Sequence, residues 1–198
     1  DDATETGGST PATTAEGGTG DPAAAAVTVE GAPLPQHEEG PIEDDVAVGE
    51  VLPTIEGTDL DGRPMAISPD GQAQLVVVLA HWCPHCQAEV PRIVDWAAEG
   101  GLPSDMELVG IATANSSNRP NYPAADWLES EGWDFPTLVD DEAQQAALAV
   151  GTSAYPFMAL TNAEALSRYV RGGRLVAIGG ETTGTTIPGR ASRAKSGT

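Results

Sequence analysis

Hydrophobic and polar positions change their spacing along this chain, and each change predicts an element of secondary structure. Residues 75–80 (LVVVLA) are a continuous apolar run rich in valine, which is typical of a strand buried on both faces of a mostly parallel sheet. Residues 106–113 (MELVGIAT) predict a second strand of this kind. Upstream, residues 51–67 alternate apolar and polar positions around Asp61-Gly62, which predicts a hairpin.

Helices are predicted between these strands. Residues 83–99 have helical spacing, with a kink at Pro91 because a proline removes a backbone hydrogen bond. Residues 123–131 and 141–150 predict two more helices. Alternating strands and helices predict an α/β fold with a central mixed sheet flanked by helices. Three short strands complete the order β-β-β-α-β-α-β-α-β-β: residues 137–139, 157–160 and 166–170.

Composition separates the folded part of the chain from its ends. Residues 1–50 contain 12 acidic residues and no lysine or arginine, and residues 1–33 are almost entirely Asp, Glu, Ala, Thr, Ser, Gly and Pro. Such a segment buries too little apolar surface to offset the entropy lost on ordering. We therefore predict a disordered acidic linker over residues 1–45, a folded domain over residues 46–180 and a flexible C-terminal tail over residues 181–198.

The formal net charge of −21 excludes some classes of partner. Nucleic acids are bound through lysines and arginines that neutralise phosphates, so no nucleic-acid partner is expected. An anionic membrane surface is disfavoured for the same reason. No apolar run approaches the roughly 20 residues that span a bilayer. The chain begins at Asp1 rather than at a methionine, which either a missing signal peptide or membrane anchor, or an arbitrary starting point, would explain.

Two cysteines, Cys83 and Cys86, are the strongest chemical signal in the chain. They lie in Trp82-Cys83-Pro84-His85-Cys86, directly after a predicted buried strand and at the start of a predicted helix. Free N–H groups and the helix dipole at this end favour a thiolate at Cys83, and Pro84 suits the first helical position. His85 adds positive charge or a hydrogen bond beside the thiolate. Cys86 is expected to be the less exposed, resolving thiol, and such a pair is what thiol–disulfide exchange requires.

A zinc site and a purely structural disulfide would each account for the cysteine pair, but both fit the sequence less well. Four-coordinate zinc needs two further ligands, and His37, His81 and His85 are the only histidines, of which His37 lies in the acidic segment. A structural disulfide would close a very short loop and would stabilise the fold little. We therefore predict neither a metal nor another cofactor.

At these residues the chain resembles the thioredoxin superfamily, and in particular the extracytoplasmic thiol–disulfide oxidoreductases of the TlpA/ResA type. The similarity covers roughly residues 46–175. The motif LVVVLAHWCPHC at residues 75–86 carries most of it, together with Glu89-Val90-Pro91, because this family typically has C-x-x-C-x-x-E-x-P at the same place.

Two further segments carry the resemblance. Residues 48–53 (VGEVLP) with residues 59–62 (DLDG) are similar to a hairpin shared by this family and peroxiredoxins. Residues 151–157 (GTSAYPF) are similar to the segment that holds a cis proline in the superfamily. The resemblance therefore implies a thioredoxin-like fold in which Pro156 is cis and faces the disulfide, with Tyr155 at the partner-binding edge.

The resemblance also implies an activity. A Cys83–Cys86 disulfide would exchange electrons with extracytoplasmic client proteins and with a redox partner. Thioredoxin carries an acidic residue on its buried strand, at the position where this chain has Val77. In this family Glu89 takes the place of that acid. A buried Glu89 would exchange a proton with Cys86. Trp82 would shield the site and contact partners. We expect an extracytoplasmic location, with a missing N-terminal segment tethering the protein to a membrane.

Pro84-His85 departs from the usual pattern of the family. This dipeptide resembles that of the strong periplasmic oxidant DsbA, and a histidine here makes the disulfide more oxidising. The direction of electron flow therefore stays open. His81 is expected to face solvent and is given no role. Residues 115–121 could contact a partner, but a plain connecting loop is favoured.

Two alternative functions remain from the sequence. A peroxiredoxin-like peroxidase shares the expected fold, but its usual T-x-x-C pattern needs a threonine where this chain has Ala80, and no arginine is evident near Cys83. A copper-binding module could use the two thiols, because soft thiolates suit Cu(I). The chain has no second cluster of soft ligands to support it.

Overall fold

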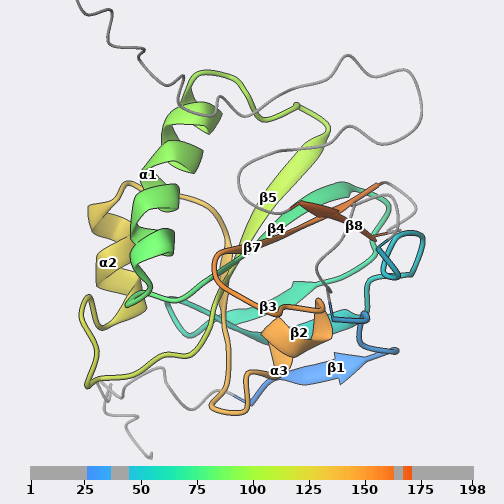
Figure 1. The fold of residues 1–198 in the computed structure, drawn as a ribbon, viewed down its shortest axis with the longest axis horizontal. Helices are drawn as coiled ribbons and strands as arrows, with labels where there is room; N and C mark the ends of the chain where they lie inside the picture. The colour runs from blue at the N-terminus through green and yellow to red at the C-terminus, as the bar shows by residue number, and fades with distance from the viewer. Residues whose placement is uncertain (1–25, 37–44, 163–166, 171–198) are drawn as a thin grey trace, which may run out of the picture.

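The structure is a computed structural model, which describes residues 26–36, 45–162 and 167–170 (Figure 1). Within these residues, strands and helices follow the predicted order, with one additional strand at the beginning. The elements in chain order are β1 (Thr28–Glu30), β2 (Thr54–Asp59), β3 (Pro64–Ile67), β4 (Ala73–Leu79), α1 (Pro84–Ala98), β5 (Met106–Ala112), α2 (Ala124–Ser130), β6 (Thr137–Val139), α3 (Gln145–Ala149), β7 (Phe157–Thr161) and β8 (Ser167–Val170).

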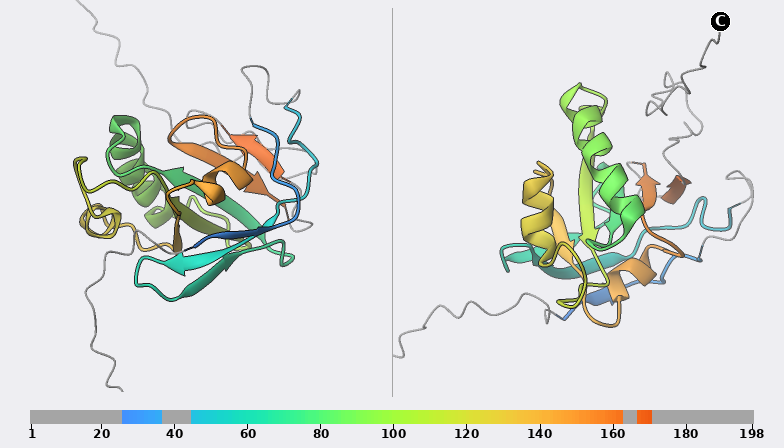
Figure 2. Two further views of the ribbon diagram at one scale, coloured as in Figure 1. Left: turned by 90° about the horizontal axis from the view of Figure 1, so that it is seen from below. Right: turned by 60° about the vertical axis from the view of Figure 1, so that its left-hand side comes forward.

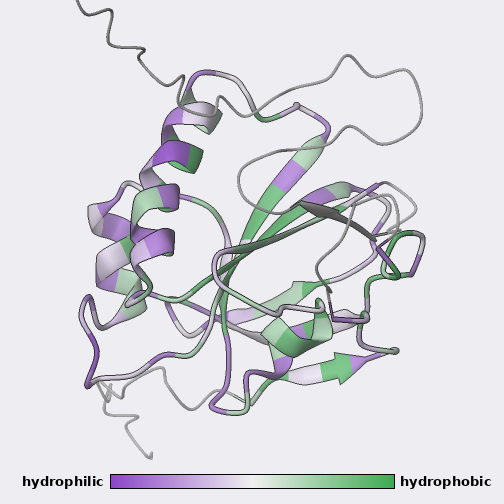
Figure 3. Cartoon of the chain, in the orientation of Figure 1, coloured by the Kyte–Doolittle hydropathy of each residue, from purple (hydrophilic) through white to green (hydrophobic). Residues whose placement is uncertain are grey.

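The described strands form one mixed sheet in the order β1-β2-β6-β5-β4-β7-β8. At its centre, β4 is parallel to β5 and antiparallel to β7, and β5 is parallel to β6. Toward the edges, β2 is antiparallel to β1, β3 and β6, and β7 is antiparallel to β8. The apolar run of β4 is therefore covered on both sides by neighbouring strands, and Figure 3 shows mostly hydrophobic residues along β4 and β5.

Alternate residues of β4 pack into two separate cores, because successive side chains of a strand point to opposite faces. Leu75, Val77 and Leu79 contact buried side chains of α1 and α2. Val76 and Val78 pack with buried side chains of β2 and α3. Figures 1 and 2 show α1 and α2 together on one side of the molecule, with α3 beside β1. The layered α/β arrangement expected from the sequence is confirmed.

Local structure confirms most of the expected elements. The hairpin of β2 and β3 turns at Asp61-Gly62, where Gly62 has a φ of 78°. Helix α1 continues through Pro91. Helix α3 is shorter than predicted, because Gln144 adopts a left-handed conformation with a φ of 59° and the helix begins only after it.

The prediction of disorder over residues 1–45 is wrong for residues 26–36. In this segment β1 pairs with β2, and the side chains of Val27 and Leu34 are only 4% and 5% exposed. The backbone N–H of Leu34 donates to the carbonyl oxygen of Ala149 over 2.9 Å. A few apolar side chains in a low-complexity segment are thus sufficient for docking, and the folded unit begins before residue 46.

Other parts of the predicted linker and tail lie outside the described residues, namely residues 1–25, 37–44 and 171–198. Among the described helices, none is long and apolar enough to cross a membrane.

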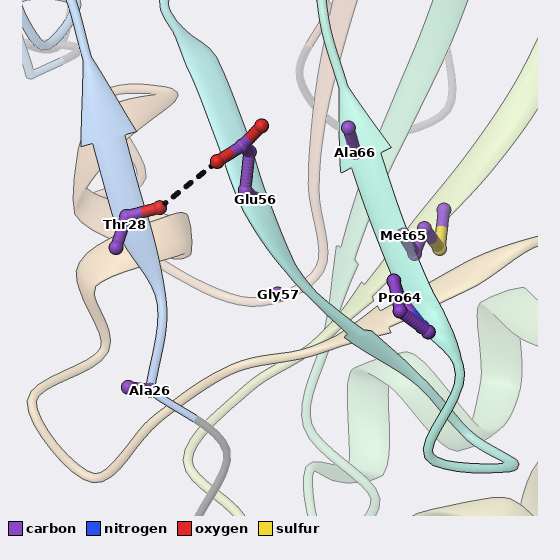
Figure 4. Close-up of a pocket in the computed structure, with 7 residues that line it drawn as sticks. All are labelled: Ala26, Thr28, Glu56, Gly57, Pro64, Met65 and Ala66. Atoms are coloured by element: carbon purple, nitrogen blue, oxygen red, sulfur yellow. Dashed lines mark hydrogen bonds between the residues drawn. The ribbon is translucent and has the colours of Figure 1, made fainter.

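An open pocket lies on the strands at one end of the sheet (Figure 4). The two polar side chains that line it form a hydrogen bond with each other, in which the Thr28 hydroxyl donates to the Glu56 carboxylate over 3.4 Å. The pocket shares no residue with the cysteine motif, and its lining residues are Ala26, Thr28, Glu56, Gly57, Pro64, Met65 and Ala66.

Candidate active site

The cysteine motif lies where β4 ends and α1 begins. Cys83 is the N-cap residue of α1, with φ −77° and ψ 120°, and Pro84 occupies the first helical position. The backbone N–H of Cys83 donates to the carbonyl of Ala80 over 2.9 Å, which fixes the turn out of the strand. Pro84 and His85 are exposed, whereas Cys83 is 7% exposed and Cys86 is fully buried. The structure therefore gives the two thiols different access to solvent.

Cys86 lies in an environment that keeps its thiol protonated. Burial raises the pKa of Cys86 to about 12, and the adjacent Cys83 adds to this increase. The backbone N–H of Ala80 donates to Cys86 Sγ over 3.5 Å and acts in the opposite direction. Desolvation is the larger effect, because the side chain is fully buried.

Cys83 contacts the loop that leads into β7. Its Sγ donates to the carbonyl oxygen of Tyr155 over 3.6 Å, and both cysteines are free thiols. The Tyr155–Pro156 peptide bond is cis, as the resemblance implies. The Tyr155 hydroxyl donates to Gln144 Oε1 over 2.6 Å, and burial raises the pKa of Tyr155. The structure thus brings Cys83, Tyr155 and Pro156 together from distant parts of the chain.

Trp82 links the motif to the loop that follows β5. Its Nε1–H donates to the carbonyl oxygen of Ala114 over 2.9 Å. Its ring meets the ring of Tyr155 edge-on at a centroid distance of 6.4 Å. The guanidinium of Arg119 lies 4.7 Å from the centroid of the Trp82 ring. Trp82 and Tyr155, the two residues predicted to contact partners, therefore lie against each other, and Arg119 contacts the Trp82 ring.

The expectation that His81 faces solvent is wrong, because its side chain is only 1% exposed. Its Nε2 accepts the backbone N–H of Ser116 over 3.2 Å, so its proton resides on Nδ1, which donates to the carbonyl oxygen of Pro120 over 2.6 Å. The His81 carbonyl accepts the side-chain amides of Gln87 and Asn121 over 3.0 and 3.3 Å. His81 therefore fastens residues 115–121 to the cysteine motif.

Glu89 lies three residues after Cys86, and residues with this spacing share one side of a helix. Its side chain is 14% exposed, and its carboxylate pairs with the guanidinium of Arg92 over 3.1 Å. Glu89 is thus partly buried. Its proton exchange with Cys86 stays a prediction.

The sequence analysis missed Asp140, a buried carboxylate at the end of β6. Thr113 Oγ1 donates to it over 2.7 Å, and the backbone amides of Ala146 and Ala147 donate over 2.8 and 3.1 Å. Burial raises the pKa of Asp140, and these hydrogen bonds act in the opposite direction. Asp140 therefore holds the start of α3, close to the Gln144 side chain that fixes Tyr155. The sequence signal that could have identified Asp140 is its position directly after the short apolar strand Thr137–Val139.

The described residues contain no group of three or more His, Cys, Asp or Glu side chains that could hold a metal ion. At the position where a peroxidase of the T-x-x-C type carries threonine, Ala80 lies fully buried. Its backbone instead serves both cysteines, because its carbonyl accepts the Cys83 N–H and its N–H donates to Cys86.

Residues 48–164 match the model of the AhpC/TSA family, a range that includes both cysteines and Pro156. The chain belongs to the AhpC/TSA family. No curated protein matches this AhpC/TSA chain at a significant level.

Solved structures that resemble this AhpC/TSA protein show its fold. A hypothetical protein from Sinorhizobium meliloti shares 21% identity, with a TM-score of 0.54 over 73% of this chain and 80% of its own. The thioredoxin domain of a thiol–disulfide oxidoreductase from Bacteroides vulgatus shares 19% identity, with a TM-score of 0.52 over 65% of this chain and 91% of its own. A secreted disulfide oxidoreductase from Mycobacterium tuberculosis, homologous to DsbE of E. coli, shares 23% identity, with a TM-score of 0.50 over 59% of this chain and 82% of its own. The expected thioredoxin-like fold is confirmed.

Proposed function

We propose that this protein is a thiol–disulfide oxidoreductase that exchanges electrons with client proteins through Cys83 and Cys86. The difference between the two thiols carries this proposal. Cys83 is the N-cap residue of α1, and its thiol donates to the Tyr155 carbonyl. Cys86 is fully buried, with its pKa raised to about 12. This is the asymmetry that an attacking thiol and a resolving thiol need.

The exchange proceeds in two displacements. The Cys83 thiolate attacks one sulfur of a client disulfide, so a mixed disulfide forms while the other client sulfur leaves and takes up a proton. Cys86 then loses its proton and attacks Cys83 Sγ, which releases the second client thiol. The client gains two electrons, and the Cys83–Cys86 pair loses two and becomes a disulfide. The reverse sequence oxidises a client dithiol.

The second displacement needs a proton acceptor, because Cys86 is protonated at neutral pH. We assign this role to Glu89, which lies on the same side of α1 and is partly buried. In the same scheme Trp82, Tyr155 and Pro156 form the edge against which a client lies, and His85 adjusts the stability of the reduced state. The TlpA/ResA-like motifs favour clients located outside the cytoplasm.

A comparison of two substrates tests this function. The full chain is assayed for catalysed reduction of a disulfide-containing protein by dithiothreitol, and separately for consumption of hydrogen peroxide. We expect catalysed disulfide reduction that the Cys83→Ala variant loses, with peroxide consumption no faster than that of a free thiol. Rapid Cys83-dependent peroxide consumption without disulfide reduction would instead identify a peroxidase.

A further inference from the structure

The loop fastened by His81 places a positive charge against Trp82, the residue before Cys83. We propose that Arg119 determines which clients react fastest, by binding a carboxylate that lies next to the client disulfide. This inference rests on the proposed exchange function and adds a substrate class to it: acidic segments around a disulfide.

The position of Arg119 is built into the structure. Both ring nitrogens of His81 hold the loop, one through Ser116 and the other through Pro120, which is the residue next to Arg119. Within the loop, the Arg119 N–H closes a turn by donating to the Ser116 carbonyl over 3.1 Å. The Arg119 side chain is exposed, and its guanidinium lies against the Trp82 ring.

Ion pairing distinguishes Arg119 from the other arginines whose side chains the structure describes. Arg63 pairs with Asp59 and Asp61 in the hairpin turn, and Arg92 pairs with Glu89. Arg119 forms no ion pair with a carboxylate in the described part of the chain, although the protein carries a net charge of −21. Its guanidinium is therefore available to an acid from outside.

The contact of Arg119 with Trp82 leaves N–H groups of the guanidinium free to donate to a ligand. The ring covers one side of the guanidinium, whose carbon lies 4.7 Å from the ring centroid, and a carboxylate can accept two of the N–H groups of an arginine. The Trp82 ring also contacts Tyr155, whose carbonyl accepts the Cys83 thiol. Trp82 and Tyr155 therefore connect the guanidinium to the edge at which a client sulfur would meet Cys83.

Small disulfides of different charge test this inference. The reduced full chain is reacted with dithiodiglycolate, which is anionic, with neutral 2-hydroxyethyl disulfide and with cationic cystamine, at an ionic strength of about 0.15 M where the distant charges of the chain are screened. Arg119→Gln is compared with Arg63→Gln, which changes the net charge equally, and with Arg119→Lys, which keeps the charge.

We expect Arg119→Gln to slow the reaction with dithiodiglycolate about fivefold, the effect of one contacting charge pair in water. The rate with 2-hydroxyethyl disulfide should stay constant, and the rate with cystamine should not fall. Arg119→Lys should retain most of the anionic rate, and Arg63→Gln should change none of the ratios.

Equal slowing of all three reactions in Arg119→Gln would mean that Arg119 only supports Trp82, and unchanged rates would mean that it does not contact the substrate. Either result overturns the inference and leaves the exchange function intact. If the wild-type chain reduced none of the three disulfides and also failed to exchange with a disulfide-containing protein, the exchange function itself would be wrong.

Discussion

The thiol of Cys83 donates to the main-chain carbonyl of Tyr155 over 3.6 Å, which joins the start of α1 to the loop before β7. The contact spans 72 positions in the sequence and places the reacting sulfur against backbone atoms. Tyr155 is held in turn by Gln144, at the start of α3. The reacting sulfur, the edge proposed to bind clients and the short helix α3 are therefore coupled through direct contacts.

The raised pKa of Cys86 predicts an unusual pH dependence of alkylation. In a Cys83→Ser variant, the rate at which iodoacetamide modifies Cys86 should rise only above pH about 10, because burial, the largest cause of the raised pKa, remains. The same variant unfolded in urea should give a midpoint near the ordinary thiol value. A midpoint near pH 9 in the folded variant would contradict this environment.

The same shift predicts a loss of stability in alkali. The folded state keeps the Cys86 proton between the ordinary thiol pKa of 9.0 and about 12, while the unfolded chain releases it. The unfolded state then binds fewer protons, so this group lowers the free energy of unfolding as pH rises above 9, by up to about 1.4 kcal/mol per pH unit. Urea unfolding of the reduced chain at several pH values between 8 and about 11 measures this slope, and a Cys86→Ala variant, which lacks the group, should show a shallower one.

Replacing Glu89 with Gln should slow the second displacement and leave the first unchanged. The amide cannot accept the Cys86 proton, and loss of a general base costs on the order of 100-fold. Stopped-flow measurement of mixed-disulfide formation and decay at several pH values separates the two steps. Asp95→Asn, an exposed acid on the same helix, is the matched control. Equal decay rates in wild type and Glu89→Gln would remove Glu89 from the mechanism.

Replacing His85 with Pro should make the disulfide less oxidising. The exposed imidazole lies in the first turn of α1, where positive charge or a hydrogen bond stabilises the reduced thiolate. Proline is tolerated in this turn, since its missing N–H has no partner within the helix. We expect the reduction potential, measured against glutathione, to fall by about 30 mV, a tenfold change in the equilibrium constant for a two-electron couple. An unchanged potential would show that His85 does not act on Cys83.

Gly151 should tolerate no side chain, because the N-terminal segment crosses it. It has a φ of 76°, and an added Cβ would lie 2.4 Å from the carbonyl oxygen of Pro35. Gly62 has a similar φ of 78° with nothing within 4 Å, so Gly62→Ala costs only the left-handed conformation, about 1–2 kcal/mol. Urea unfolding should show a larger loss for Gly151→Ala. Equal losses would mean that residues 26–36 do not dock there.

The parts of the fold that the sequence predicts are those that local patterns determine. The valine-rich run of β4 identifies a central strand, and Cys83-Pro84 marks the beginning of α1. The position of Pro156 opposite Cys83 followed from family resemblance. The sequence around each of these residues does not indicate that the two lie close together. The site of the cysteine pair was thus accessible to sequence reasoning.

Long-range contacts explain what the sequence did not predict. Leu34 looks like part of a polar tail until its partner Ala149 is known, more than a hundred residues away. The role of His81 depends on Pro120, 39 residues later in the chain. Asp140 looks like a surface acid unless Thr113 and the start of α3 are placed around it. In each case burial and hydrogen bonding come from residues that no local pattern connects.

Trapping of the mixed disulfide tests the central claim most directly, since it identifies the attacking sulfur. The Cys86→Ala and Cys83→Ala variants are each incubated with a disulfide-containing protein, quenched with acid and analysed by mass spectrometry. The different environments of the two thiols predict abundant mixed disulfide at Cys83 in the Cys86→Ala variant and very little at Cys86 in the Cys83→Ala variant. Equal trapping by both variants, or trapping mainly at Cys86, would contradict the assignment of Cys83 as the attacking thiol.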